Sequence, residues 1–274
     1  MTTLPPPGPE SKRTPDSSLP AVLAHLAAEL PTAHRRAWIR VLNTTPAPTP
    51  DAEARLLTAS PGGTRTELAR TLIRAWNTAQ PVPDGPALAL ALQTAALAHT
   101  AAAESRRVDL VVSGPATPTV PVRYTAQVIA EVIRAAHQRL LVVSFAAYRI
   151  PEVVTALHAA AARGVHLDVI LESSREAGGP LRQDARTAFG ALTAHFWHWP
   201  AKQRRNGSGQ ASLHAKLVAA DEHTALLGSA NLTGQALTHN LEIGVVLHNP
   251  DVVGRLVAHF RTLMNDQHGV LQRL

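Results

Sequence analysis

The 274-residue sequence predicts an α/β fold with a mixed, mostly parallel sheet that helices cover on both faces, preceded by an α-helical N-terminal region. From residue 108 onward, short apolar segments of strand length alternate with longer segments of helical length, which is the pattern of βαβ units. Before that point, apolar residues recur at the spacing of amphipathic helices. Hydrophobic residues make up 45% of the chain and charged residues 17%, which indicates a globular chain with a core.

The N-terminal part divides into a tail and a helical region. Residues 1–17 are rich in Pro, Ser and charge, which predicts a disordered tail. Ser18 can cap a first helix that carries its leucines on one stripe. Further helices are expected at residues 33–43, 51–59, 64–79 and 86–103. The last begins with an alternating Ala-Leu segment, but its length and alanine content favour a helix. The helical region is therefore expected to span residues 18–105.

The C-terminal part, residues 106–274, is expected to form one domain that contains the catalytic residues. Strands are expected at residues 108–113, 139–145, 165–171, 195–199 and 241–247. Helices are expected at residues 123–137, 151–163, 181–193 and 251–264. Gly164 stands where a helix C-terminal glycine belongs, which supports the end of the second of these helices.

Composition restricts the classes of function. Lys and Arg number 26 against 20 Asp and Glu, and the formal charge of +6 suits a polyanionic partner such as nucleic acid or an acidic membrane surface, although many basic chains bind neither. The sequence contains no cysteine, which excludes disulfides and thiolate metal sites. It shows no apolar run of about 18 residues and no signal-peptide core, so a cytoplasmic location is expected.

One stretch, residues 212–233 (SLHAKLVAADEHTALLGSANLT), concentrates the polar groups that carry chemistry. Its spacing is H-x-K-x4-D-x6-G-S-x-N, formed by His214, Lys216, Asp221, Gly228, Ser229 and Asn231. The apolar residues around the polar pair predict a strand, in which His214 and Lys216 point the same way, about 7 Å apart. A tight turn at Asp221 and a returning strand would bring the Gly-Ser-Ala-Asn segment back toward the pair. An imidazole, an ammonium, a hydroxyl and a carboxamide around one spot predict an anion site that contains a nucleophile.

This motif resembles the signature of the phospholipase D superfamily at all six positions, and Glu242 in NLEIGVVL resembles the glutamate that the family adds on the next strand. The resemblance implies a phospholipase D-like fold and a metal-independent phosphodiesterase without a cofactor. His214 would attack phosphorus and form a covalent phosphohistidine, while Lys216 and Asn231 stabilise the phosphate oxygens.

The resemblance gives supporting roles to the remaining motif residues. Ser229 and Gly228 would add hydroxyl and backbone donors, and Glu242 would hydrogen-bond the far nitrogen of the imidazole. Asp221 is counted with the catalytic residues, and its alternative role is to order the loop at the turn.

The mechanism that the resemblance implies needs a second imidazole as general acid, and the chain has one motif. The candidates His137, His158 and His166 have no lysine two residues on. The second imidazole is therefore expected from another copy, in a homodimer that shares one active site. His195 and His198 in HFWHW lie on opposite faces of a predicted strand, so they are expected to be packing or rim residues and not a metal site.

Longer segments, among them VVSFAAY, AAAARGVHLDVILESS and SANLTGQAL, look similar to the phospholipase D-like component encoded with bacterial DISARM anti-phage systems. This similarity implies a nuclease, with DNA favoured as partner, that works alongside other components of a defence system. Substrate contacts are expected from the basic loop PAKQRRNGSGQ and from one arginine outside it, namely Lys202, Arg204, Arg205 and Arg123. The strand ends near Ser144 and Glu172 are further candidates.

Two other classes of function stay open at this point. The first is a lipid-directed phosphodiesterase or transphosphatidylase, although no stretch has the aromatic apolar face of a membrane-surface helix. The second is a non-catalytic binding module of a defence complex.

Overall fold

The computed structural model describes residues 17–59, 63–115, 117, 119, 122–174, 180–206, 209–265 and 267–274, and for residues 63, 64, 205, 206, 209 and 210 it describes the backbone alone. Residue contacts divide the chain into two compact units, residues 1–103 and 104–274. The tail expected at residues 1–17 lies, up to residue 16, outside the described residues.

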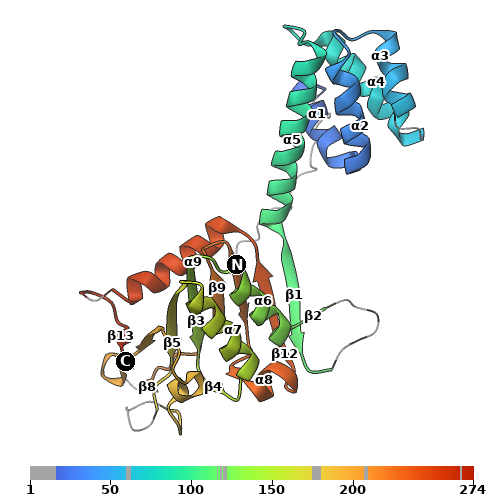
Figure 1. Ribbon diagram of the computed structural model, residues 1–274. Coiled ribbons are helices and arrows are strands. Elements are labelled where there is room, and N and C mark those ends of the chain that lie inside the picture. The colour runs from blue at the N-terminus through green and yellow to red at the C-terminus, as the bar shows by residue number, and fades with distance from the viewer. Residues whose placement is uncertain are drawn as a thin grey trace, which may run out of the picture. The chain divides into compact units, whose positions relative to one another are not determined.

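The N-terminal unit is helical, as its apolar spacing predicts. Its helices are α1 (Leu19–Glu29), α2 (Thr32–Asn43), α3 (Pro50–Ala59), α4 (Gly63–Thr78) and α5 (Gly85–Arg106) (Figure 1). Leu26, Trp38 and Trp76 are fully buried in its core. The Trp76 indole satisfies its N–H by donating to the carbonyl of Pro83 at 2.8 Å. Each such buried side chain stabilises the unit by about 1.5–3 kcal/mol.

Helix α5 is long and apolar enough, by length and composition, to cross a membrane. Leu88 and Leu92 pack in the core of the N-terminal unit, whereas Leu90 and Leu97 are exposed. The core helix of a globular unit passes the same test, so this observation is weak evidence for a membrane span.

The C-terminal unit, within its described residues, contains a nine-stranded sheet in the order β13-β6-β5-β3-β9-β10-β12-β1-β2. The strands are β1 (Val108–Ser113), β2 (Arg123–Tyr124), β3 (Arg139–Ser144), β5 (His166–Leu171), β6 (His195–His198), β9 (Leu217–Ala220), β10 (Thr224–Gly228), β12 (Glu242–Leu247) and β13 (Gln272–Arg273). Neighbours β3 and β5, β5 and β6, and β1 and β2 run parallel. The other pairs are antiparallel.

The mixed α/β class is confirmed, but the expectation of a mostly parallel sheet is wrong. From β3 through β6 the chain follows the βαβ pattern, since β5 lies parallel beside β3 and β6 lies parallel beside β5. The hairpin β9–β10 then enters the sheet beside β3 with its strands antiparallel, and β12 adds to it in the antiparallel sense. Short turns permit antiparallel neighbours without a crossover, which explains this half of the sheet.

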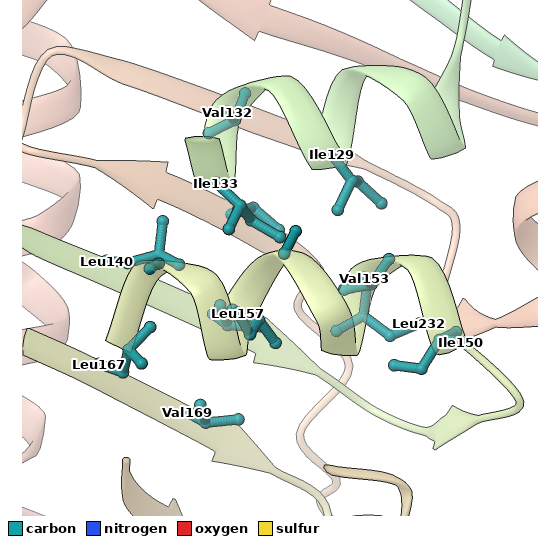
Figure 2. Packing of buried hydrophobic residues seen from close by; sticks show 14 of the residues in the cluster. Ile129, Val132, Ile133, Leu140, Ile150, Val153, Leu157, Leu167, Val169 and Leu232 are labelled. Carbon is teal, nitrogen blue, oxygen red and sulfur yellow. The ribbon is translucent and has the colours of Figure 1, made fainter. Parts of the chain in front are cut away.

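Helices cover both faces of the sheet, as expected. On one face lie α6 (Thr125–Ala135) and α7 (Pro151–Ala162), and on the other α9 (Pro250–Leu263). Side chains of β3 point alternately to the two faces of the sheet. Leu140 therefore packs in the core beneath α6 and α7, whereas Leu141 packs in the core beneath α9. Figure 2 shows Ile133 of α6 and Leu157 of α7 packed over the strands of the first core.

Several expected elements differ in detail. The helix expected at residues 181–193 is a short 3-10 helix, Ala185–Phe189, which begins after Asp184 and ends at Gly190 with φ +57°. The helix expected from residue 123 begins two residues later, because Arg123 and Tyr124 pair with β1. Gly164 has φ +84° after α7, as its predicted role at the helix end requires.

The remaining elements are short. They are β4 (Ala147–Tyr148), β7 (Arg205–Asn206), β8 (Gly209–Gln210), β11 (Leu232–Thr233), α8 (Gly234–Thr238) and a 3-10 turn at Ala201–Gln203. Among them, β11 pairs with β4 and so ties the end of the motif stretch to the loop after β3.

Candidate functional site

The hairpin β9–β10 brings the two halves of the motif to one edge of the sheet. Leu217, the first residue of β9, pairs with Leu227 near the end of β10. The residues that precede β9 and those that follow β10 therefore emerge side by side. Lys216 from the first half and Gly228 from the second line the same cavity, together with Ala230.

His214 and Lys216 form the first half of the site. The Lys216 Nζ lies 2.9 Å from His214 Nδ1 and donates to the His214 carbonyl at 2.7 Å. The sequence predicted that both residues lie within a strand. In the structure they lie in the segment before β9, which begins at Leu217. The His214 imidazole is exposed, with the Phe145 ring 5.5 Å away. Burial lowers the pKa of the Lys216 ammonium, against the opposing effect of the Glu242 carboxylate.

Gly228, Ser229 and Asn231 form the second half of the site. A Cβ at Gly228 would lie 2.9 Å from the carbonyl oxygen of Ile243, so the neighbouring strand requires glycine there. The amide oxygen of Asn231 is buried and, among the described residues, has no hydrogen-bond partner. A buried acceptor without a donor is costly, so this oxygen is an exception to the rule that buried polar groups are hydrogen-bonded.

Glu242 holds Ser229 and not the imidazole. Its carboxylate accepts from Ser229 Oγ at 2.5 Å and from the Asn240 side chain at 3.2 Å. No hydrogen bond joins Glu242 to His214 within the described part of the chain. The expected contact is absent because β10 lies between β12, which Glu242 begins, and β9, which His214 precedes. Glu242 therefore orients the hydroxyl of the second half of the site.

A buried ion pair supports the backbone just before His214. The Glu172 carboxylate receives two hydrogen bonds from the Arg204 guanidinium, at 2.6 and 2.7 Å, and both side chains are fully buried. The same carboxylate accepts from the backbone N–H of Leu213 at 2.7 Å. The Arg204 Nε donates to the carbonyl of Trp199 at 2.6 Å. The expectation that Arg204 contacts substrate is therefore wrong, because its charge is neutralised inside the protein.

Asp221 lies at the other end of β9, away from His214. Its carboxylate accepts from the backbone N–H groups of His137, Gln138 and Arg139 at 2.6, 2.8 and 2.8 Å. Burial acts to raise the pKa of Asp221, but these three donors outweigh it, and the pKa lies below its usual value. Of the two roles considered for Asp221, the structure places it in the ordering role, where it joins the turn to the start of β3.

The other three residues expected to contact substrate are Arg123, Lys202 and Arg205, and their environments differ. Arg123 pairs with two carboxylates, those of Asp109 and Glu131, which neutralise its charge. Lys202 is exposed and forms no ion pair with a described residue. The side chain of Arg205 lies outside the described residues. Lys202 is thus the member of the predicted basic set that the described structure leaves available to an anion.

The arrangement provides the parts of a phosphate-transfer site. An exposed imidazole stands beside an ammonium. The Gly-Ser segment lies on the same edge, where the Ser229 hydroxyl donates to Glu242 and the Ser229 N–H donates to the Ile243 carbonyl. An ammonium stabilises charge that develops on phosphate oxygens, while the imidazole can act as nucleophile.

Sequence reasoning missed the function of Glu172 and Arg204 as a pair. They are 32 residues apart, and nothing in the local pattern distinguishes Arg204 from its neighbours in a basic loop. The one available signal was the position of Glu172, a charged residue directly after the buried strand β5. Ser144 is buried as well, and its hydroxyl accepts from the backbone N–H of Leu232 at 3.1 Å, which fixes the end of the motif stretch.

Comparisons with known proteins identify a matching family and similar chains. Residues 129–264 match the family described as "Cardiolipin synthase, PLD-like domain". The DISARM protein DrmC of Bacillus paralicheniformis is 28% identical over 141 residues, which cover 51% of this chain and 56% of that protein. Cardiolipin synthase A of Pseudomonas aeruginosa is 31% identical over 155 residues, 55% of this chain and 29% of that enzyme. The chain thus spans about half of the first relative and less than a third of the second.

Solved structures are similar at a lower level. The phospholipase D family member Nuc from Salmonella typhimurium has a TM-score of 0.41 at 22% identity, over 57% of this chain and 91% of Nuc. NucT from Helicobacter pylori has a TM-score of 0.46 at 15% identity, over 57% of this chain and 93% of NucT. At these TM-scores and identities the solved structures are not used to assign a family. The family assignment rests on the sequence matches. The motif, the matched family and the sequence relatives together place this chain in the phospholipase D superfamily.

Proposed function

We propose that this protein is a metal-independent phosphodiesterase that acts on nucleic acid, with DNA as the favoured substrate, in a bacterial anti-phage system. The observation that carries the proposal is the exposed His214 imidazole, with Lys216 Nζ at 2.9 Å and the Gly228–Asn231 segment on the same edge. The similarity to a DISARM protein supports the biological setting. In that setting a cytoplasmic location is expected.

The first chemical step forms a bond between an imidazole nitrogen of His214 and the phosphorus of a phosphodiester. The bond from phosphorus to the leaving oxygen breaks, and a general acid gives that oxygen a proton. The Lys216 ammonium, which now contacts His214 Nδ1, would turn to the non-bridging oxygens as phosphate enters. This exchange frees the imidazole from a cation that competes for its lone pair.

The second step returns the enzyme to its starting state. Water attacks the phosphohistidine, the phosphorus–nitrogen bond breaks, and the same group that acted as acid now accepts the proton from water. The chain has one motif, so we assign this acid and base role to His214 of the partner subunit in a homodimer. Asn231 and Ser229 would bind the phosphate oxygens through both steps.

Nucleic acid is favoured as the substrate for reasons of charge. The chain carries a formal charge of +6, and phosphate contacts supply much of the affinity of nucleic-acid-binding proteins. Lys202, exposed and without a carboxylate partner among the described residues, stands in the loop that leads to Leu213. The further components of a defence system would then select which nucleic acid reaches the site.

A lipid-directed phosphodiesterase or transphosphatidylase is the second candidate. Two observations favour it, namely the 31% identity to a cardiolipin synthase and the exposed leucines of α5. The phosphodiester chemistry would be the same, and the acceptor in the second step would be an alcohol in place of water.

The experiment is a cleavage assay in EDTA on labelled single- and double-stranded DNA and RNA, beside a panel of anionic phospholipids. We expect cleavage of nucleic acid by the wild type, none by His214→Ala, and a trapped phosphohistidine after acid quench. His158→Ala removes an exposed histidine from α7, away from the motif, and serves as the matched control with full activity expected.

Each other result points elsewhere. Turnover of phospholipids alone would establish the lipid-directed enzyme. Equal activity in His214→Ala would exclude His214 as the nucleophile. Salt-dependent DNA binding without turnover on any substrate would favour a non-catalytic binding module.

A further inference from the structure

The starts of β5 and β6 gather three groups that the phosphodiesterase chemistry does not use. His166 and Asp168 point to the same face of β5, and His195 lies across from Asp168 on β6. We propose that these three side chains form a binding site for a transition-metal ion of the Zn²⁺ type, which fastens β5 to β6.

The distances suit an ion held between the three groups. His166 Nε2 lies 3.4 Å from one oxygen of Asp168, and His195 Nδ1 lies 3.6 Å from the other. The ligand atoms of the three residues all lie within 4.8 Å of one another. Tetrahedral zinc, with bonds of about 2.0–2.1 Å, holds its ligand atoms about 3.3 Å apart. The side chains therefore need small movements to close around an ion.

The carboxylate of the cluster has an outer hydrogen-bond partner, as metal-ligating carboxylates do. The Trp197 indole N–H donates to Asp168 Oδ1 at 3.0 Å and fixes the carboxylate. Outer hydrogen bonds of this kind orient metal ligands and raise affinity. All three ligand residues are partly buried, with the two imidazole side chains 38% and 40% exposed, so an ion can enter from solvent.

Two nearby arginines narrow the class of ion. Arg139, on β3, pairs with His166 on β5. Arg273, on β13, stacks over the Trp197 ring, with its guanidinium carbon 5.3 Å from the ring centroid. One carboxylate beside two guanidinium groups is a poor site for Mg²⁺ or Ca²⁺, which bind through several oxygen ligands. Two imidazoles and a carboxylate suit Zn²⁺, Ni²⁺ or Cu²⁺.

The site is separate from the catalytic edge. His166 begins β5, whereas Glu172 follows its last residue, so the length of the strand lies between the two sites. Beyond β6 the sheet has only the two-residue strand β13 among the described residues. An ion at this place would secure the edge of the sheet, and its loss would leave EDTA-resistant phosphodiester chemistry in place.

The test is a Zn²⁺ competition titration of the full chain without an affinity tag against a chromophoric chelator. We expect one Zn²⁺ per chain for the wild type, and a loss of affinity of at least about 100-fold in both His166→Ala and His195→Ala, because outer partners alone contribute about 10–100-fold. His158→Ala is the control and should bind as the wild type does. Zn²⁺ should raise the Tm of the wild type and the control, and leave the Tm of the two ligand variants unchanged.

Circular dichroism and the Tm without Zn²⁺ show whether each ligand variant is folded. If one of the two is not, Asp168→Asn, which keeps the shape of the side chain, takes its place. Wild-type affinity in the ligand variants would overturn the proposal. So would the absence of stoichiometric binding by the wild type.

Discussion

Glu172 connects the interior of the C-terminal unit to the backbone of the candidate nucleophile. Its carboxylate takes two hydrogen bonds from Arg204 and one from the Leu213 N–H, the residue before His214. Removing one partner of a buried ion pair leaves an uncompensated charge, which costs more than the pair contributes. The pair can therefore be removed as a whole to separate its effect on stability from its effect on the site.

We predict that Arg204→Met lowers the free energy of unfolding by about 3–5 kcal/mol, because Glu172 is then buried without its cation. The double variant Glu172→Met/Arg204→Met should regain much of that loss, since neither charge remains. Its kcat should stay low, because the Leu213 N–H has no acceptor and His214 is no longer held. Urea unfolding and phosphodiesterase assays on the same preparations measure the two effects.

The exposed pair of Arg261 with Glu222 provides the control. Arg261→Met removes the same cation from a solvated pair and should cost about 1 kcal/mol or less, with kcat unchanged. A double variant that recovers both stability and kcat would show that Glu172 has a structural role alone.

At the level of residues, the sequence predicted the cluster but not every contact. His214 contacts Lys216, and Lys216 lines one cavity with Gly228, because a hairpin has few ways to close. Arg204 and Glu242 were misplaced for two different reasons. Burial of a single arginine depends on a partner 32 residues away, and the contact of Glu242 depends on which strand lies between it and β9.

The hairpin that carries the motif is fixed at its turn as well as at its open end. Asp221 and Glu222 have φ values of +49° and +61°, the left-handed region that Asp and Asn tolerate better than most residues. The Asp221 carboxylate joins this turn to the backbone at the start of β3. The turn therefore sets the position of β9 beside β3, and through it the position of the site.

We predict that Asp221→Asn, which keeps the shape of the side chain and tolerates the positive φ, lowers the free energy of unfolding by about 1–3 kcal/mol at pH 7. The pKa of Asp221 in the fold lies below its ordinary value, so the carboxylate contributes its full stability above that value. The contribution is lost as the pH falls through the folded pKa. The difference between wild type and variant should therefore shrink below about pH 4, the ordinary range of aspartate.

Unfolding by urea at pH 7, 5 and 3 gives this difference directly, and Asp251→Asn at the exposed start of α9 is the control. A constant difference across these pH values would mean that the charge of Asp221 does not contribute. A large loss of kcat in folded Asp221→Asn would return the residue to the catalytic set.

At the level of elements, helices were predicted better than the pairing of strands. Apolar spacing is local, and α7 and α9 begin and end within two residues of expectation. The order and direction of strands depend on contacts between segments that are far apart in the sequence, and a local pattern does not show these contacts. The segment at residues 181–193 has helical composition, but the left-handed backbone of Gly190 allows only a short 3-10 helix.

The whole molecule poses a problem of stoichiometry, since the proposed reaction needs two imidazoles and each chain brings one motif. A homodimer with its cleft on a two-fold axis solves it, because each His214 then faces its copy. Within one chain, His198 is the histidine at the nearby end of β6, and it contacts Ser173 at 2.9 Å. Burial lowers the pKa of His198, with Arg204 adding to the effect, which makes it a poor proton donor at neutral pH.

We therefore predict that activity depends on pairs of intact chains. Wild-type protein mixed with an excess of His214→Ala should lose activity as heterodimers form, because each heterodimer has one imidazole where the reaction needs two. With ninefold excess and free exchange, about a tenth of the wild-type chains remain in intact pairs. Exchange is verified with two affinity tags, and the same mixture with His158→Ala, which keeps its site, should lose nothing. Activity that stays constant through verified exchange would mean that each chain holds a self-sufficient site, and the proton donor would then have to be sought on the same chain, beginning with His198.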